Sequence, residues 1–271
     1  MNMLQPGVAF SESTVTLPIS EEETAVPVFI GYTENSVAKS LIFIQSMADF
    51  TGLLGGPDTS GDNASILYYA VQHYFDNGGR PCFVYPVDSY TVLRTGTRDV
   101  IAAALCAAAG SLAILQEPTV TLLSIPDIVL LDGDTSTDSW VLVWRAMLQA
   151  CQGKTGLFSL LDAPACAEAA MACAKADGLV ASEHGAAYWP RLISDYKGAG
   201  GQAIALPPSA AVAWGQGRQS LAVETSDQSG DSIAAAAADR PGGVLEAGAR
   251  GDTEEQLGTC DLRGRSRLGT A

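Results

Sequence analysis

Short apolar runs alternate with amphipathic segments along the first 213 residues of the chain. An apolar run of four to eight residues bounded by turn residues predicts a buried strand, whereas apolar residues that recur three and four positions apart predict a helix. Strands are predicted at 25–32, 41–44, 82–87, 120–125, 156–161 and 186–190, and helices at 67–75, 100–115, 140–151 and 166–175. Strands separated by helices indicate an α/β fold, with a mostly parallel sheet flanked by helices.

The segment around residues 67–75 has the clearest helical pattern. Its apolar residues share one face, and Asn77-Gly78-Gly79 follows it directly. Glycine tolerates the left-handed conformation just past a helix, so this tripeptide is expected to end the helix before the strand at 82–87. For the helix at 140–151, Asp138 or Ser139 is available as the N-cap.

The pattern divides the chain into three parts. Residues 1–23 are expected to form an extended N-terminal arm, and residues 24–213 the α/β domain. Residues 214–271 have no recognisable pattern, and from Gly215 onward they contain no Phe, Tyr or Trp. Such a segment cannot bury enough apolar surface to offset its ordering entropy, so a disordered C-terminal tail is predicted.

Charge and composition exclude several classes of partner. The chain has 271 residues and a net charge of −15, which argues against nucleic acid and anionic membranes as partners. No apolar run is expected to reach the ~18 residues that span a bilayer, and the N-terminus lacks a signal-peptide pattern. The six cysteines include no Cys-x-x-Cys pair and there are two histidines, so neither a metal nor a cofactor is expected.

Two short motifs imitate ligand-binding loops. Gly153-Lys154-Thr155 resembles the end of a phosphate-binding loop, but the glycine required five positions earlier is Leu148. A polar turn between helix and strand is therefore expected there. The acidic residues from position 132 to 138 resemble a calcium loop, which fails because its sixth and twelfth positions are Thr137 and Val143.

Asp132 and Asp134 are the only candidate catalytic residues. Asp132-Gly133-Asp134-Thr135-Ser136 follows an apolar run, as does the nucleophile motif of haloacid-dehalogenase-like phosphatases. In that motif the first Asp is the nucleophile and the second is the general acid and base, both at the carboxyl end of a strand. Ser136 departs from the motif, and no later acidic pair suits magnesium. The chain is therefore not expected to be an enzyme, and this phosphatase is the alternative.

Eight segments of the chain match, in the right order, the motifs of one protein family. The aromatic helix and glycine turn followed by a strand at 67–84 resemble the motifs "AV..FF.NGG" and "CYVVRV". The other seven lie at 6–12, 29–33, 46–56, 122–127, 160–164, 186–190 and 206–209, and they resemble "PGVYVEE", "AFVGYT", "S..EF...FGG", two strand ends, "AALYYPW" and "VPPSG". The signature positions are Tyr74, Phe75, Asn77, Gly78, Gly79, Asp162, Pro164, Pro207 and Pro208. Together the eight segments resemble the contractile tail sheath proteins of bacteriophages, of the short type also found in R-type bacteriocins.

The resemblance implies a structural subunit that polymerises in a helical sheath around an inner tail tube protein and contracts to drive the tube through a target cell envelope. It implies baseplate and tail terminator proteins as further partners, a place in the virion tail and assembly in the bacterial host cytoplasm. It also implies that an N-terminal arm adds a strand to a neighbouring subunit. The arm residues are Pro6, Gly7, Val8, Phe10, Val15, Leu17 and Ile19, whose alternation of apolar and polar positions is typical of a strand.

The resemblance stops after residue 213. Codons exist for residues 222–228 that, shifted by one base, read Pro-Trp-Lys-Pro-Pro-Thr, close to the family's "GVWKAPAN". The hypothesis is that the tail from about Trp214 is a frameshifted translation of a longer sheath gene, and such a chain alone is not expected to form full sheaths. A naturally short subunit with its own tail is the alternative. The nucleotide sequence decides between them, since no frame restores the family pattern if the hypothesis is wrong.

Overall fold

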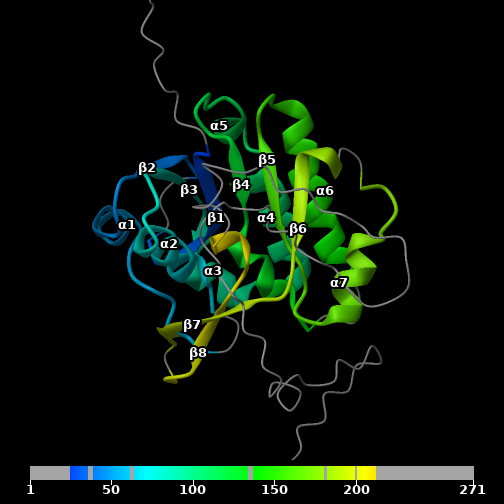
Figure 1. The fold of residues 1–271 in the computed structure, drawn as a ribbon. Helices are drawn as coiled ribbons and strands as arrows, with labels where there is room; N and C mark the ends of the chain where they lie inside the picture. The colour runs from blue at the N-terminus through cyan, green and yellow to red at the C-terminus, as the bar shows by residue number, and fades with distance from the viewer. Residues whose placement is uncertain are drawn as a thin grey trace, which may run out of the picture.

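The computed structural model describes residues 25–35, 39–61, 64–133, 137–179, 182–198 and 200–211. These residues form an α/β domain in which a sheet of six strands is flanked by helices on both faces, with a small hairpin beside it (Figure 1). The predicted α/β class and the mostly parallel sheet are confirmed. The N-terminal arm with its residues 6–19, and the C-terminal tail from residue 214, lie outside the described residues.

The helices and strands follow one another in a fixed chain order, with bounds as follows. They are β1 (Pro27–Thr33), β2 (Ile42–Ile44), α1 (Met47–Leu54), α2 (Leu67–Asp76), β3 (Cys82–Ser89), α3 (Tyr90–Thr95), α4 (Arg98–Ala109), α5 (Leu112–Leu115), β4 (Leu122–Ser124), the 3-10 helix η1 (Pro126–Leu131), α6 (Asp138–Gly153), β5 (Phe158–Asp162), α7 (Ala167–Ala174), the 3-10 helix η2 (Ser182–His184), β6 (Gly185–Tyr188), β7 (Leu192–Lys197) and β8 (Ala203–Leu206).

The strand order of the large sheet is β2-β3-β1-β4-β5-β6. All neighbouring pairs are parallel except β2 with β3, which are antiparallel. β1 lies between β3 and β4, with Val28 opposite Phe83 on one side and Leu123 on the other. The chain therefore winds from β1 first toward β3 and then toward β4, which makes the carboxyl end of β1 the point where the winding reverses.

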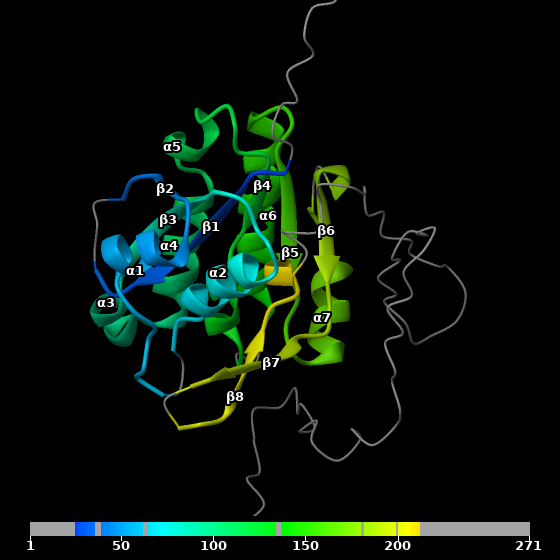
Figure 2. The same ribbon diagram turned by 60° about the vertical axis from the view of Figure 1, so that its left-hand side comes forward.

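Alternate residues of the strands build a separate core on each face of the sheet. Phe29 of β1 packs with residues of α1 and α2 on one face. Its neighbours Val28 and Ile30 pack with residues of α3, α4, α6 and α7 on the other. Figures 1 and 2 show α1 and α2 on one side of the sheet and α4 and α6 on the opposite side. All seven residues of β1 are buried, as its continuous apolar run predicts.

Two local predictions are wrong, and the hairpin of β7 and β8 is missing from the predicted elements. The helix expected at 100–115 is broken at Gly110 into α4 and α5. The N-cap of α6 is Thr137, without a side-chain capping bond, so the proposal of Asp138 or Ser139 is wrong. The hairpin of β7 and β8 was not predicted, because most residues of β7 are exposed and give no apolar run.

Residues 98–115, which include α4 and α5, bear on the prediction that no apolar run is long enough to span a membrane. This stretch of 18 residues has a mean hydropathy of 1.7, enough by length and composition alone to cross a membrane. The expectation that no run would reach that length is therefore corrected. One such stretch is weak evidence of a span, and here it is interrupted at Gly110 while Ile101 and Leu105 are buried in the core.

Candidate functional site

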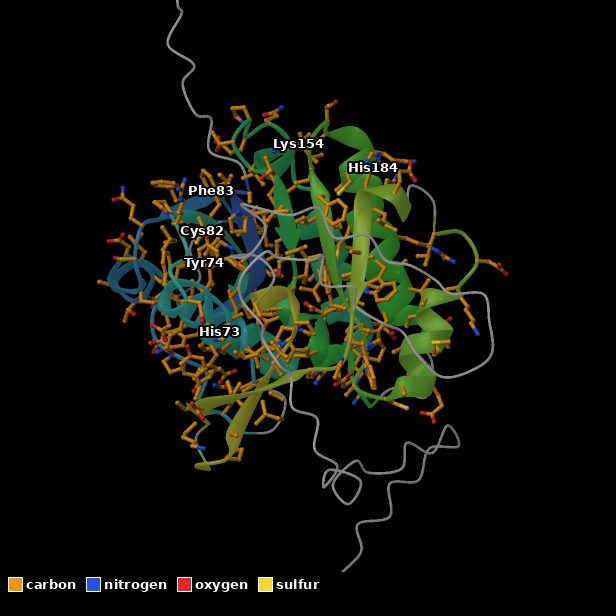
Figure 3. All side chains as sticks on the ribbon, viewed as in Figure 1. His73, Tyr74, Cys82, Phe83, Lys154 and His184 are labelled. Atoms are coloured by element: carbon orange, nitrogen blue, oxygen red, sulfur yellow. The ribbon has the colours of Figure 1, made fainter. Side chains whose placement is uncertain are left out.

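The signature residues at the end of α2 form a packing motif. Tyr74 is 2% exposed, and its ring meets the edge of Phe29 of β1 with 5.4 Å between the ring centroids. The backbone N–H of Arg80 donates to the Tyr74 hydroxyl at 3.1 Å. Figure 3 shows Tyr74 beside Cys82 at the start of β3. This arrangement joins α2 to β1 and to the start of β3.

The glycines after α2 allow this close packing. Gly78 has a φ of +85°, in the region that favours glycine. The N–H of Gly79 donates to the Tyr74 carbonyl at 2.9 Å. A β-carbon on Gly79 would lie 2.4 Å from the Tyr74 ring, which no real contact allows. Phe75 packs on the same core and Asn77 Nδ2 donates to the His73 carbonyl, so the five signature residues of this turn serve packing and helix termination.

A buried carboxylate, Asp127, occupies the point where the sheet's winding reverses. Asp127 is the second residue of η1, just after β4, and is fully buried. Its Oδ2 accepts from the Tyr32 N–H at 2.7 Å and from the Ser65 hydroxyl at 2.7 Å. Its Oδ1 accepts from the N–H groups of Ile66 at 2.8 Å and Leu67 at 3.1 Å, which open α2.

This position is where doubly wound α/β proteins bind anionic ligands, because helix N-termini and strand ends present free N–H groups there. In this chain the donors are already used by Asp127. Burial raises the pKa of Asp127 to about 6, while the hydrogen bonds oppose that rise. Gly31 allows the close approach, since a β-carbon there would lie 2.5 Å from Asp127 Oδ2. The chain therefore supplies its own anion at this point.

A second buried carboxylate, Asp162, ends β5. Its Oδ1 accepts from the Ser209 N–H at 2.8 Å, and its Oδ2 contacts the Ser209 hydroxyl at 2.5 Å. The Ser209 hydroxyl also meets that of Ser124, at the end of β4, at 2.9 Å. The structure thus brings together signature segments 47 residues apart in the chain. Pro164, Pro207 and Pro208 beside them are buried.

The two buried carboxyls predict how stability depends on pH. Burial raises the pKa from 3.8 to about 6 at Asp127 and to about 7 at Asp162. Between pH 3.8 and these raised pKa values the folded chain binds more protons than the unfolded chain. The free energy of unfolding therefore falls as the pH rises through this range. Going from pH 5 to pH 8 is expected to cost on the order of 2–4 kcal/mol, measured by urea unfolding.

Asp162→Asn is the control for this pH dependence. It is expected to remove the larger part of the change, because the side chain with the higher pKa no longer titrates. An unaltered pH dependence in this variant would show that other groups cause it.

Asp132 does not occupy the position that the phosphatase alternative requires. The apolar run before it is the 3-10 helix η1 rather than a strand, so Asp132 is not at a strand end. Its carboxylate forms an ion pair with Arg191, and burial raises its pKa while Arg191 opposes the rise. Asp134 lies outside the described residues. The geometry gives the phosphatase no support.

Lys154 forms part of the polar turn that was expected after α6. Its Nζ donates to the carbonyls of Ile114 at 3.2 Å and Glu117 at 2.5 Å. Lys154 therefore satisfies carbonyl groups at and just after the carboxyl end of α5. The two histidines lie far apart, His73 on α2 and His184 before β6 (Figure 3). Across the described ranges, no group of three or more His, Cys, Asp or Glu side chains is placed to hold a metal ion.

The β7–β8 hairpin packs against α2 through tyrosines. The Tyr196 hydroxyl donates to Asp76 at 2.6 Å, and the Tyr196 ring lies 6.0 Å from that of Tyr69. On the hairpin, Ile193 is 77% exposed and Leu192 is 40% exposed. The hairpin is therefore attached at one surface and carries exposed apolar side chains elsewhere.

Tyr196→Phe is expected to loosen the hairpin without unfolding the domain. The substitution removes one charge-assisted hydrogen bond and keeps the ring. Amide hydrogen exchange in β7 and β8 is expected to rise severalfold while that of β1 is unchanged. Equal exchange in the hairpin of both proteins would show that the bond to Asp76 does not hold it.

Comparison with solved structures finds similar chains in contractile machines. A chain in the cryo-EM structure of the anti-feeding prophage (AFP) baseplate in the contracted state is 25% identical, with a TM-score of 0.58. The match covers 78% of this chain and 54% of that one, so this chain spans about half the neighbour's length. No model of a protein family matches the chain, and no curated protein does.

Two further neighbours have TM-scores too low to support an argument. One is the AFP baseplate after six-fold symmetrisation, at 24% identity and a TM-score of 0.47, covering 80% of this chain and 52% of that one. The other is a PVC sheath complex of an extracellular contractile injection system in the contracted state. It has 25% identity and a TM-score of 0.45, covering 79% and 49%.

The fold and the geometry at the strand ends define an α/β domain whose polar groups are used for internal packing. The comparison adds that the domain is structurally similar to a chain of the contracted anti-feeding prophage baseplate.

Proposed function

We propose that the chain is a structural subunit of a contractile tail sheath, which polymerises around an inner tube and contracts to drive it through a target cell envelope. The observation that carries the proposal is the similarity to a chain of a contracted baseplate, at a TM-score of 0.58. The packing role of the α2 turn supports it, because a lattice subunit needs rigidity rather than a reactive site. Asp127 supports it too, since it fills the ligand position of the sheet.

The finer parts of the proposal follow from the sequence resemblance. Copies of the subunit form a homo-oligomer, a helical sheath of the short type. Neighbouring copies are linked by an arm that includes Phe10 and Leu17. Its other partners are the tail tube, baseplate and tail terminator proteins. It is part of a phage or prophage virion tail and assembles in the cytoplasm of the bacterial host.

Immunogold electron microscopy tests this function. Antibodies are raised against the recombinant chain and applied to contractile particles purified from cells that carry its gene. Labelling is expected along the whole length of the tail, at regular spacing, in extended and contracted particles. Particles that remain unlabelled, or that are labelled at one end only, would contradict a sheath subunit.

A further inference from the structure

The cluster around Asp162 joins three segments of the chain at the carboxyl end of the sheet. Asp162 ends β5, Ser124 ends β4, and Ser209 belongs to the turn of residues 207–211. Asp162 is 2% exposed, and both serines are fully buried. The three contacts that join them measure 2.5–2.9 Å.

Among the described residues, the turn has few polar contacts with the sheet other than those of Ser209. Within the turn, the N–H groups of Ala210 and Ala211 donate to the carbonyls of Pro207 and Pro208. The side chain and the N–H of Ser209 thus join this turn to the ends of β4 and β5. If these contacts open, the turn can leave the sheet without disrupting a strand.

Two titratable groups, Arg191 and Tyr188, and the indole of Trp144 face Asp162. Arg191 lies close enough for its charge to lower the pKa of Asp162, but it is paired with Asp132. Tyr188 of β6 is opposite Asp162 in the sheet, and its buried hydroxyl has no hydrogen-bond partner among the described residues. The indole N–H of Trp144 donates to the Asp162 carbonyl and not to its carboxyl. The carboxyl therefore has no full counter-charge.

We propose that Asp162, Ser209 and Ser124 form a proton-dependent clamp that holds the 207–211 turn on the sheet and loosens when Asp162 ionises. When the carboxyl is protonated, its O–H donates to the Ser209 hydroxyl, which in turn donates to Ser124. When the carboxyl is ionised, its buried charge accepts from two donors, the N–H and the hydroxyl of Ser209. Opening of the turn then becomes more favourable, because it lets water reach the charge. The proposal does not depend on the sheath function.

The pKa of Asp162 sets the direction and the size of the effect of pH on opening of the turn. Burial raises the pKa of Asp162 from 3.8 to about 7, while the two Ser209 hydrogen bonds and the charge of Arg191 oppose the rise. If opening of the turn returns the pKa of Asp162 to 3.8, the equilibrium constant for opening rises about tenfold per pH unit between pH 3.8 and about pH 7. Above about pH 7 the constant levels off. From pH 5 to pH 7 the clamp is therefore expected to open up to about a hundredfold more often.

Amide hydrogen exchange by NMR on the whole chain tests the clamp. After correction for intrinsic exchange, protection of the Ser209 N–H is expected to fall about tenfold per unit from pH 5 to pH 7. In the same samples, the N–H of Ala70 in α2 is expected to stay more strongly protected than that of Ser209 at every pH, because the turn opens without unfolding the domain. Ser209 protection that does not change with pH, or that equals the protection of Ala70 at every pH, would overturn the proposal.

Asp162→Asn separates the proton from the contacts. The amide imitates the protonated carboxyl, since its oxygen accepts from the Ser209 N–H and its nitrogen donates to the Ser209 hydroxyl. The variant is expected to keep Ser209 protected at pH 8 as well as at pH 5. A pH dependence equal to that of the wild type would overturn the proposal. If the variant does not fold, the comparison of Ser209 with Ala70 in the wild type decides alone.

Discussion

Asp127→Ala is expected to destabilise the domain by about 3–5 kcal/mol, which is a large part of the stability of a typical domain. The substitution leaves the N–H groups of Tyr32, Ile66 and Leu67 and the Ser65 hydroxyl without their acceptor. Buried donors without acceptors lose their hydration and gain nothing in return. Urea unfolding followed by circular dichroism measures the loss.

Asp127→Asn is the matched control, because it keeps the shape and one of the two acceptor oxygens. Its free energy of unfolding is expected to lie between those of the wild type and the alanine variant. If alanine costs less than about 1 kcal/mol, the four hydrogen bonds do not hold α2 to the sheet and the account of this position is wrong.

Gly79→Ala is expected to cost about 3 kcal/mol, because the new β-carbon would overlap both the ring and the carbonyl oxygen of Tyr74. Neither can move far: the ring is 2% exposed against Phe29, and the carbonyl accepts the Gly79 N–H. The melting temperature and urea midpoint of the variant give the measurement.

Gly78→Ala distinguishes crowding from backbone strain at the same turn. A β-carbon on Gly78 meets nothing within 4 Å, but its φ of +85° is unfavourable for alanine. The expected loss is about 1 kcal/mol. A larger loss at Gly78 than at Gly79 would mean that the turn conformation, not the contact with Tyr74, makes this segment sensitive.

The central strands could be predicted because they are buried on both faces. β1 and β3 are then continuous apolar runs, and α2 shows its buried stripe directly in the sequence. The hairpin could not be predicted in this way. In β7 the residues alternate between exposed and half-buried, so the apolar pattern that indicates a strand is missing.

The two buried carboxylates were harder to predict than the strands that carry them. Asp127 follows Pro126 and Asp162 lies two residues before Pro164, each near a strand end, which is a visible signal. Their partners Ser65 and Ser209 come from distant segments, and only the strand order places them there. The resemblance drew attention to Asp162 and the 206–209 segment but did not indicate that they meet.

The sheath function is tested most directly by cryo-EM of contractile particles purified from cells that carry this gene. The account predicts that the α/β domain of residues 25–211 fits density repeated in rings around the tail tube, with the side chains of Tyr74 and Trp144 recognisable. Particles whose rings are built from another chain, with no density that fits this domain, would contradict it.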